Sequence, residues 1–299
     1  MPKPLFSLFI PQMRMPFATI LERVRAAEAN GFEGISLMDH LAPPALPASD
    51  MYDCFVTAAA VAAATTSVSI TPLVTCASFR HPAVLAKMAV SLDHLSDGRF
   101  ELGIGWGSVP AELGVYGVHD EPPAVRSARL GEQLAIIEQL FTGEPFDHEG
   151  HFYQMKDAQQ RPRPLDGSIP ILIGGAGPKL TMPLVARYAD WWNVPSTDVH
   201  RVDEMRSLAG DARVSTQHVI GLAASSATLA DVEALTRKRF GNWGGVIIGT
   251  PDQVADQLIA VARSGVERFF LPFSDFAPPE TLALFSREVM PAVRSALDD

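Results

Sequence analysis

The sequence is poor in cysteine, with only Cys54 and Cys76 among its 299 residues. Two cysteines are too few for the disulfide framework of a small secreted domain, and too few for a metal cage built from thiolates. A chain of this length can bury a large core without such crosslinks. We therefore expect a protein of the reducing cytoplasm that is stabilised mainly by hydrophobic packing.

A surplus of positive charge is also missing. The chain has 24 Lys and Arg against 34 Asp and Glu, which gives a formal net charge of -10. A general nucleic-acid binder, or a protein that docks on an anionic membrane, needs the opposite balance. No apolar run is long enough to span a bilayer, and Pro11 interrupts the apolar stretch near the start, unlike the core of a signal peptide. We expect a soluble protein of enzyme size that acts on a small molecule, with neither nucleic acid nor membrane as a partner.

What the sequence does contain is a regular alternation of short β-rich runs and longer helical patterns. The β-rich runs are residues 5–10, 32–38, 68–75, 100–106, 170–175, 191–195, 218–224 and 268–273. The clearest helical patterns span residues 16–31, 53–64 and 82–96, and a further one ends near Phe141. Eight strands that each precede a helix predict a parallel (β/α)8 TIM barrel, with an open Rossmann sheet as the alternative. In a barrel, binding and catalytic residues lie at the carboxyl ends of the strands.

Two stretches interrupt this alternation. Residues 142–169 are rich in turn formers and contain one alternating run, which predicts a hairpin insertion. Residues from about 225 to 250 form a second excursion that contains a helix and a glycine-rich segment. Directly after it, Thr250, Pro251 and Gln253 form a helix start with a capping hydroxyl, a proline in the first turn and a capping-box glutamine. We expect residues 1–299 to form one domain that carries both insertions.

Three glycines end the fourth predicted strand. The segment Gly98–Leu113 reads GRFELGIGWGSVPAEL, so Gly103, Gly105 and Gly107 are spaced two apart. Glycines at a strand end let a flat ligand approach the backbone, because no Cβ stands in the way. The segment therefore predicts either the floor of a cofactor site or a core strand kinked by glycine.

The tripeptide Asp-His-Leu occurs twice, and its position separates the two copies. Asp39 and His40 follow the second predicted strand, at the end of the barrel where catalysis takes place. Asp93 and His94 lie near the end of a helix, where a histidine suits the helix dipole and needs no other role. We predict a site role for Asp39 and His40, with an ordinary loop histidine as the alternative, and a structural role for the second pair.

The loop after the third strand carries further polar groups. Thr75, Ser78, Arg80 and His81 are all expected on the same active face of the barrel. A hydroxyl and two cationic or titratable groups suit the polar edge of a ring. The alternative is an ordinary loop in which Arg80 is solvated.

The segment GGAGPKLT, residues 174–181, follows the fifth strand and opens a helix. Backbone amides and the helix dipole at such a position bind anions, and Lys179 and Thr181 add contacts. A strand before and a helix after are the context that a phosphate site requires. The segment therefore predicts a phosphate-binding loop.

The segment Asp147–His151 combines two histidines with two carboxylates. Its spacing matches neither a zincin helix nor an EF-hand loop, and the alternation with Phe146 and Phe152 fits a half-exposed hairpin. We therefore expect no metal site. The sequence also has no G-x-S-x-G nucleophile elbow, which argues against an α/β-hydrolase.

Set in order, these segments make the chain resemble the bacterial luciferase-like monooxygenase superfamily, and within it the branch that uses the deazaflavin coenzyme F420. The resemblance is carried by Asp39-His40, by RHPAVLAKMAVSLDHLSDGRFELGIGWG (80–107), by IGGAGPKLTMPLVARYADWWN (173–193) and by GTPDQVADQLIAVARSGVERFFL (249–271). It implies a (β/α)8 barrel with insertions, usually a homodimer. The ring of F420, or of FMN as the alternative, is then held at the carboxyl ends of the strands.

The resemblance also implies roles for particular residues. Asp39 and His40 are expected beside the ring and the reacting substrate, as the catalytic residues. A cis peptide is expected between Leu73 and Val74, in a bulge of the third strand. The cofactor-binding residues that it implies are Leu73, Val74, Thr75, Gly105, Trp106, Gly107, Ser108, Gly174, Gly175, Ala176, Gly177, Lys179 and Thr181, the last six of them at the phosphate.

The chain departs from the sugar-phosphate dehydrogenases of this branch at two positions. Those members have an acidic residue about where this chain has Ser108, and a tryptophan where this chain has Pro44. Both departures argue against glucose 6-phosphate as a substrate.

The leading hypothesis is an oxidoreductase that transfers a hydride between F420 and a small organic substrate, with His40 as acid, base or hydrogen-bond donor. The first alternative is a monooxygenase of the same superfamily that uses reduced FMN. A cofactor-binding barrel without turnover is the second, and a metal-dependent barrel hydrolase is more distant.

Overall fold

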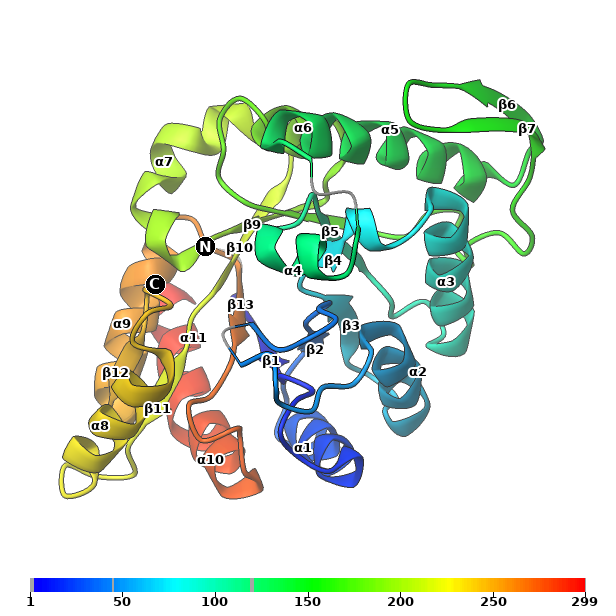
Figure 1. Ribbon diagram of the computed structural model, residues 1–299. Coiled ribbons are helices and arrows are strands. Elements are labelled where there is room, and N and C mark those ends of the chain that lie inside the picture. Colours follow the sequence, from blue (N-terminus) through cyan, green and yellow to red (C-terminus); the bar gives the residue numbers. More distant parts are fainter. Residues whose placement is uncertain (1–2, 45, 119–120, 299) are drawn as a thin grey trace.

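Parallel strands form a barrel in the computed structural model, which describes residues 3–44, 46–118 and 121–298 (Figure 1). Within these residues the sheet has nine strands in the order β3-β2-β1-β13-β10-β9-β8-β5-β4. Their bounds are β1 Leu5–Phe9, β2 Gly34–Leu37, β3 Ser69–Pro72, β4 Thr75–Cys76, β5 Leu102–Gly105, β8 Ile171–Gly174, β9 Trp191–Val194, β10 Arg213–Gln217 and β13 Arg268–Leu271.

The strands β3 and β4 share one place in the barrel. The peptide bond between Leu73 and Val74, which separates them, is cis, as the resemblance implied. β4 pairs with β5, and Ile70 of β3 bridges to Phe100 just before β5, so the two halves together close the ring. The nine strands therefore fill eight places, and the predicted (β/α)8 barrel is confirmed.

Helices surround this barrel (Figure 1). Their bounds are α1 Phe17–Ala29, α2 Cys54–Ala64, α3 Pro82–Leu95, α4 Pro110–Val115, α5 Pro123–Thr142, α6 Met182–Tyr188, α7 Val202–Met205, α8 Leu229–Phe240, α9 Pro251–Arg263, α10 Pro279–Leu284 and α11 Met290–Asp298, with 3-10 turns at 77–79, 196–201 and 206–208 and a π-helical turn at 285–289. α9 begins with the predicted capping box of Thr250 and Gln253, and it buries Val254 and Leu258 against the core. The sequence did not predict α4.

Side chains fill the interior of the barrel beneath the carboxyl ends of its strands. Phe9, Met38, Leu73, Leu172, Trp191 and Phe270 pack there as one buried cluster. Below them, the guanidinium of Arg268 lies over the ring of Trp191 and donates to the buried carboxylate of Glu101, with Nη2 to Oε1 at 2.9 Å. Because these side chains fill the amino end of the barrel, a large ligand can enter it only at the carboxyl ends of the strands.

The seventh barrel strand is β10, so the prediction that residues 218–224 form this strand was wrong. β10 pairs with β9 and β13, although its Ser215 and Thr216 are polar. Both hydroxyls are buried and satisfied, since Thr216 Oγ1 donates to the carbonyl of Val194 at 2.9 Å and Ser215 Oγ donates to Asn193 Oδ1 at 3.2 Å. A strand whose polar groups are paired inside a barrel has no hydrophobic pattern by which it could be recognised.

The apolar run that was mistaken for this strand belongs to the second excursion. Its β11, Ile220–Leu222, pairs in parallel with β12, Ile247–Gly249, and α8 connects the two. This small unit lies beside α9 in Figure 1. The excursion therefore starts before the predicted residue 225.

The chain returns from α8 to the barrel at Trp243–Gly245. His218 Nδ1 donates to the carbonyl of Gly245 at 2.6 Å, and Ser196 Oγ donates to the carbonyl of Gly244 at 3.4 Å. Both glycines have positive φ, and a Cβ on Gly245 would lie 2.2 Å from the Cβ of Ser196. Glycine is thus required for this segment to pack closely on the ends of β9 and β10.

The first insertion contains an antiparallel hairpin of β6, Phe146–Glu149, and β7, Gln154–Ala158. The carboxylate of Glu132 on α5 accepts from His148 Nε2 at 3.1 Å and from the amide of Tyr153 at 2.8 Å. Asp93 accepts from the amide of Leu165 at 2.8 Å, and His94 Nε2 bonds to the carbonyl of Arg163 at 2.8 Å. Asp93 and His94 therefore have the structural role that was predicted for them, and His148 serves to anchor the hairpin.

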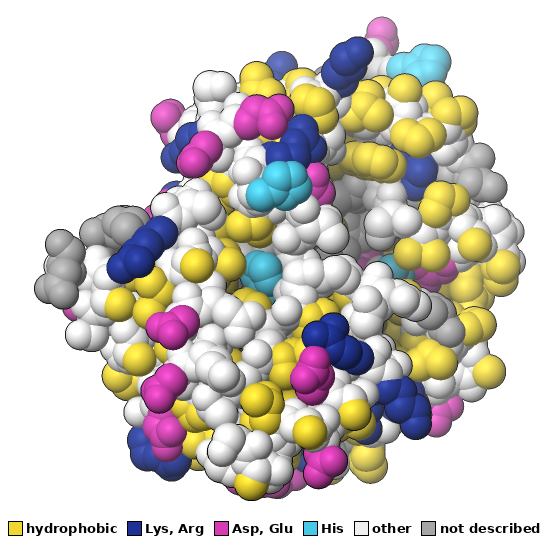
Figure 2. Space-filling view, turned by 90° about the vertical axis from the view of Figure 1, so that its left-hand side faces the viewer, with side chains coloured by type: hydrophobic (Ala, Val, Ile, Leu, Met, Phe, Trp, Pro, Cys, Tyr) yellow, Lys and Arg dark blue, Asp and Glu magenta, His cyan; other side chains and the backbone are white. Residues whose placement is uncertain are grey.

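Charged side chains of both signs are intermingled on the face shown in Figure 2, rather than gathered in one patch. In the part of the chain that the structure describes, no helix is long and apolar enough to cross a membrane.

The first prediction concerns Gly103 in β5. A Cβ there would lie 1.8 Å from the carbonyl oxygen of Pro72, so Gly103→Ala must push two strands apart. We expect a loss of about 1–3 kcal/mol in the free energy of unfolding, measured by urea titration. The control is Gly131→Ala on α5, where the nearest atom is the mobile Cδ2 of Leu184 at 3.2 Å and no comparable loss is expected. Equal losses in both variants would contradict this account.

The second prediction concerns the pH dependence of stability. Burial lowers the pKa of His218 below its usual value, and the hydrogen bond to Gly245 only partly opposes this. Below about pH 6.5 the unfolded chain takes up a proton at His218 that the folded chain does not, so stability falls as the pH falls. We expect the free energy of unfolding to decrease more steeply from pH 8 to pH 5 in the natural protein than in His218→Asn. Parallel curves for the two proteins would show that His218 does not titrate in this way.

Candidate active site

A cavity of about 880 Å³ opens at the carboxyl ends of the barrel strands. Its wall contains all the residues that were predicted as catalytic or cofactor-binding, and these come from four separate segments of the chain. These are Asp39, His40, Leu73, Val74, Thr75, Gly105, Trp106, Gly107, Ser108, Gly174, Gly175, Ala176, Gly177, Lys179 and Thr181. The fold thus gathers into one place residues that are far apart in the sequence.

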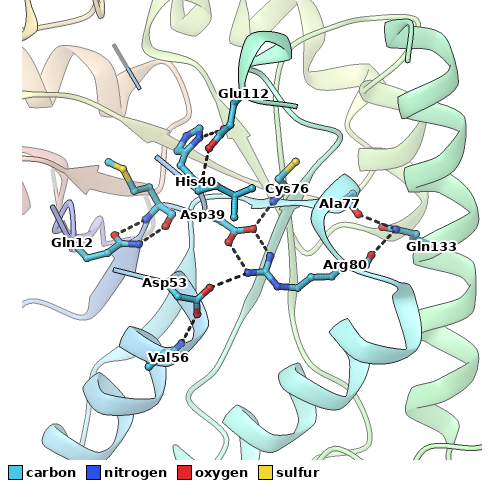
Figure 3. A network of polar contacts seen from close by, with 12 residues as sticks. Gln12, Asp39, His40, Asp53, Val56, Cys76, Ala77, Arg80, Glu112 and Gln133 are labelled. Atoms are coloured by element: carbon cyan, nitrogen blue, oxygen red, sulfur yellow. Dashed lines mark hydrogen bonds and ion pairs between the residues drawn. The ribbon is translucent and has the colours of Figure 1, made fainter. Parts of the chain in front are cut away.

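Asp39 is buried, and both of its carboxylate oxygens are occupied (Figure 3). Oδ2 accepts from Arg80 Nη1 at 2.6 Å and from the amide of Cys76 at 2.9 Å, while Oδ1 accepts from Arg80 Nη2 at 2.9 Å. This bidentate pair ties the end of β2 to the end of β4 and to the start of α3.

Arg80 is not solvated, so that alternative is wrong. Its side chain is 12 % exposed and also lies 3.4 Å from Asp53 Oδ2. Burial acts to lower the pKa of Arg80, but the hydrogen bond and the charge of Asp39 raise it by more, so the guanidinium stays charged. Ser78 and His81 do not line the cavity, and His81 instead caps α3 by accepting from the amide of Ala83.

His40 is held by Glu112, a residue that the sequence interpretation missed. Glu112 Oε2 lies 2.7 Å from His40 Nδ1 (Figure 3). Oε1 of the same carboxylate accepts from the amides of Leu41 at 2.6 Å and Ala42 at 3.2 Å. A carboxylate can only accept, so Nδ1 carries the hydrogen and Nε2 is the nitrogen left for the cavity. Glu112 lies on α4, four residues after Ser108, and no sequence pattern shows that this short helix reaches back to His40.

Two glycines, which have no side chains, shape one wall of the cavity. A Cβ on Gly105 would lie 2.9 Å from Val74 Cγ2, and a Cβ on Gly174 would lie 3.3 Å from Val74 Cγ1. Next to Val74, the hydroxyl of Thr75 is buried and has no hydrogen-bond partner in the described residues. This wall therefore combines a flat backbone surface with an unsatisfied hydroxyl.

The loop between β8 and α6 carries unsatisfied amides. The backbone N–H groups of Ala176, Gly177, Lys179 and Leu180 have no acceptor in the described part of the chain, and all four residues line the cavity. Thr181 Oγ1 accepts from Trp106 Nε1 at 3.3 Å, which joins this loop to the end of β5. Unpaired amides beside an exposed lysine suit an anionic group.

Cys76 also lines the cavity, but its thiol is not set up as a nucleophile. Burial, together with the nearby charge of Asp39, raises the pKa of Cys76 to about 11. The thiolate that cysteine catalysis requires is therefore scarce near neutral pH.

The rest of the wall consists mainly of residues that the sequence interpretation did not single out. Apolar members are Phe9, Met38, Val219 and Trp243, and polar members are Asn193, Gln217, Ser196 and Thr197. Gln217 and Val219 were missed because the seventh strand had been misplaced. Trp243 lies in the second excursion, whose return to the barrel mouth no sequence signal predicts.

Comparison of this chain with known proteins identifies its family. The family model described as luciferase-like monooxygenase matches residues 6–210. An uncharacterized protein of Mycobacterium tuberculosis is 30% identical over 262 residues, which cover 79% of this chain and 88% of that protein.

Two solved structures show the same fold. An F420-dependent secondary alcohol dehydrogenase in complex with an F420-acetone adduct superposes with a TM-score of 0.83 at 19% identity, covering 98% of this chain and 99% of the other. The oxygenating constituent of 3,6-diketocamphane monooxygenase from Pseudomonas putida, in complex with FMN, superposes with a TM-score of 0.78 at 19% identity. The match covers 97% of this chain and 99% of the other. Because the family model spans well over half of the sequence, the chain belongs to the luciferase-like monooxygenase family.

Proposed function

We propose that this protein is an oxidoreductase that transfers a hydride between coenzyme F420 and a small organic substrate. The structures that resemble this chain include an F420-dependent enzyme and an FMN-binding enzyme. The observation that carries the proposal is His40, whose Nδ1 is fixed by Glu112 at 2.7 Å and whose Nε2 is left unpaired among the described residues of the cavity. A hydride transfer to or from a carbonyl carbon requires such a proton-handling group at the oxygen.

The residues present fit a planar ring with an anionic tail. The glycine wall at Gly105 and Gly174 has room that a Cβ would fill, and the buried hydroxyl of Thr75 lacks a partner that a ring heteroatom would supply. The unpaired amides of 176–180, with Lys179, would hold the phosphate. When bound, the deazaflavin supplies a carbon centre that accepts or releases a hydride.

His40 would carry the proton that accompanies this hydride. In alcohol oxidation the hydroxyl proton passes to Nε2 while the hydride leaves the carbon, and a carbonyl remains. In the reverse direction Nε2–H returns the proton to the carbonyl oxygen. Glu112 keeps the hydrogen on Nδ1 and stabilises the imidazolium that forms when Nε2 is protonated.

Asp39 would act through position rather than by proton transfer. Its two oxygens already accept three hydrogen bonds, from Arg80 and from the amide of Cys76. We therefore propose that Asp39 fixes the backbone on which His40 stands, and that His40 is the catalytic residue.

A monooxygenase that uses reduced FMN is the second candidate function, and one observation favours it. Among the described residues that line the cavity, Lys179 is the one Lys or Arg. One cation suits the single phosphate of FMN, whereas the acidic tail of F420 gains from a longer cationic groove. Arg161 and Arg163 lie outside this lining and do not extend it.

Coenzyme titration tests the choice between the two. Purified protein is titrated with F420 and with FMN while the ring fluorescence is followed, and we expect F420 to bind more tightly. Lys179→Ala should weaken binding about 10-fold, since a charge-assisted hydrogen bond to phosphate is lost. Lys238→Ala removes the same charge from α8, outside the cavity, and should change little. Tighter binding of FMN with oxygen-dependent turnover would establish the second candidate instead.

Substitution at His40 tests the mechanism. His40→Ala should slow hydride transfer about 10²–10⁴-fold while the dissociation constant of the coenzyme stays the same. Glu112→Gln keeps an acceptor for Nδ1 but loses the charge, so it should slow the reaction less than Glu112→Ala. Rates come from stopped-flow measurement of the coenzyme absorbance. Unchanged turnover in His40→Ala would remove this residue from the mechanism.

A further inference from the structure

We propose that the side of the cavity lined by Phe9, Met38 and Val219 takes a neutral, predominantly apolar alcohol or ketone, and that Trp243, whose segment is tied to the ends of β9 and β10, forms a wall against which it packs. This substrate class rests on the proposed function. In the strand order, three barrel places separate β1 from β8 in either direction, so the two strands face each other. Phe9 at the end of β1 is therefore across the cavity from Gly174 at the end of β8.

The wall on this far side is apolar. Phe9 and Met38 line the cavity there, and Val219 and Trp243 extend this apolar surface toward the ends of β10 and β9. Trp243 is 44% exposed although its ring is the largest apolar surface that a side chain offers. An apolar substrate that covers this ring gains about 25 cal/mol for each Å² removed from water. Gln217 at the end of β10 offers a neutral amide group to this surface, and Asn193, which is paired with Gly174, offers another next to the phosphate loop.

The charges around the cavity disfavour an anionic substrate at this place. The lining holds two carboxylates, of which Asp39 is neutralised by Arg80 and Glu112 is bonded to His40 and two amides. Among the described residues that line the cavity, the one Lys or Arg is Lys179, in the loop after β8. A carboxylate or phosphate group near His40 would lose its hydration, meet the negative charge of Glu112 and find no cation.

Trp243 is held in place rather than loosely attached. Its ring packs edge-on against Phe240, with centroids 5.4 Å apart. Gly244 and Gly245, which follow it, bond to Ser196 and His218 at the ends of β9 and β10. A tryptophan fixed on both sides gives the apolar wall a defined shape, and this makes it a determinant of specificity and not only of affinity.

The test is a matched pair of ligands that differ by one carboxylate. Cyclohexanol and trans-4-hydroxycyclohexanecarboxylate are titrated into the coenzyme-free protein, and binding is followed by saturation-transfer NMR. We expect the carboxylate to bind at least about 10-fold more weakly. Trp243→Ala should weaken the binding of cyclohexanol about 10-fold, and Trp243→Phe should retain most of the affinity for cyclohexanol. Gln217→Lys adds a cation to the apolar surface and should strengthen binding of the carboxylate.

The control is Tyr116→Ala, which removes an aromatic side chain of similar exposure, 49%, outside the cavity lining and should leave both affinities unchanged. Equal binding of the two ligands, or undiminished cyclohexanol binding in both Trp243 variants, would overturn the inference. A failure of the proposed function has a different signature: cyclohexanol binds as expected, but bound F420 shows no substrate-dependent change in fluorescence.

Discussion

The bidentate pair between Asp39 and Arg80 is the interaction on which the site depends. It joins the end of β2, which carries His40, to the loop that follows β4 and opens α3. Removing two charges from water costs several kcal/mol, so such a pair adds little net stability by itself. Its value is geometric, since a planar guanidinium donates two parallel hydrogen bonds to a carboxylate in only one orientation. The backbone before His40 is thereby fixed, and the amide of Cys76 is fixed by the same carboxylate.

The second constraint is the absence of side chains where backbones meet. Gly103 allows the carbonyl of Pro72 to approach β5, and Gly105 and Gly174 leave room around Val74. Each of these places would be closed by one methyl group. Close backbone packing at the barrel end and a flat cavity wall therefore have a common cause, which is why glycines alternate with Ile104 and Trp106 along this strand.

The cavity is completed by parts of the chain outside the barrel repeat. α4 brings Glu112 to His40, and the second excursion brings Trp243 to the apolar side of the cavity. The (β/α)8 scaffold supplies the rigid strand ends, while insertions supply the residues that face the substrate. An F420-dependent and an FMN-binding structure share this scaffold, so differences in substrate are expected in these added segments.

The sequence by itself determined the barrel, the ends of most strands and the residues of the glycine wall and the loop after β8, because these follow local rules: apolar runs, capping residues, and glycines at strand ends. It also singled out His40 by its place after a strand. The tertiary structure alone decided that Arg80 neutralises Asp39, that Glu112 holds His40, and that β10 rather than residues 218–224 completes the barrel. Each of these depends on a contact between segments far apart in the chain. The burial of Ser215 and Thr216, or the pairing of one carboxylate with one histidine, leaves no periodic trace in the sequence.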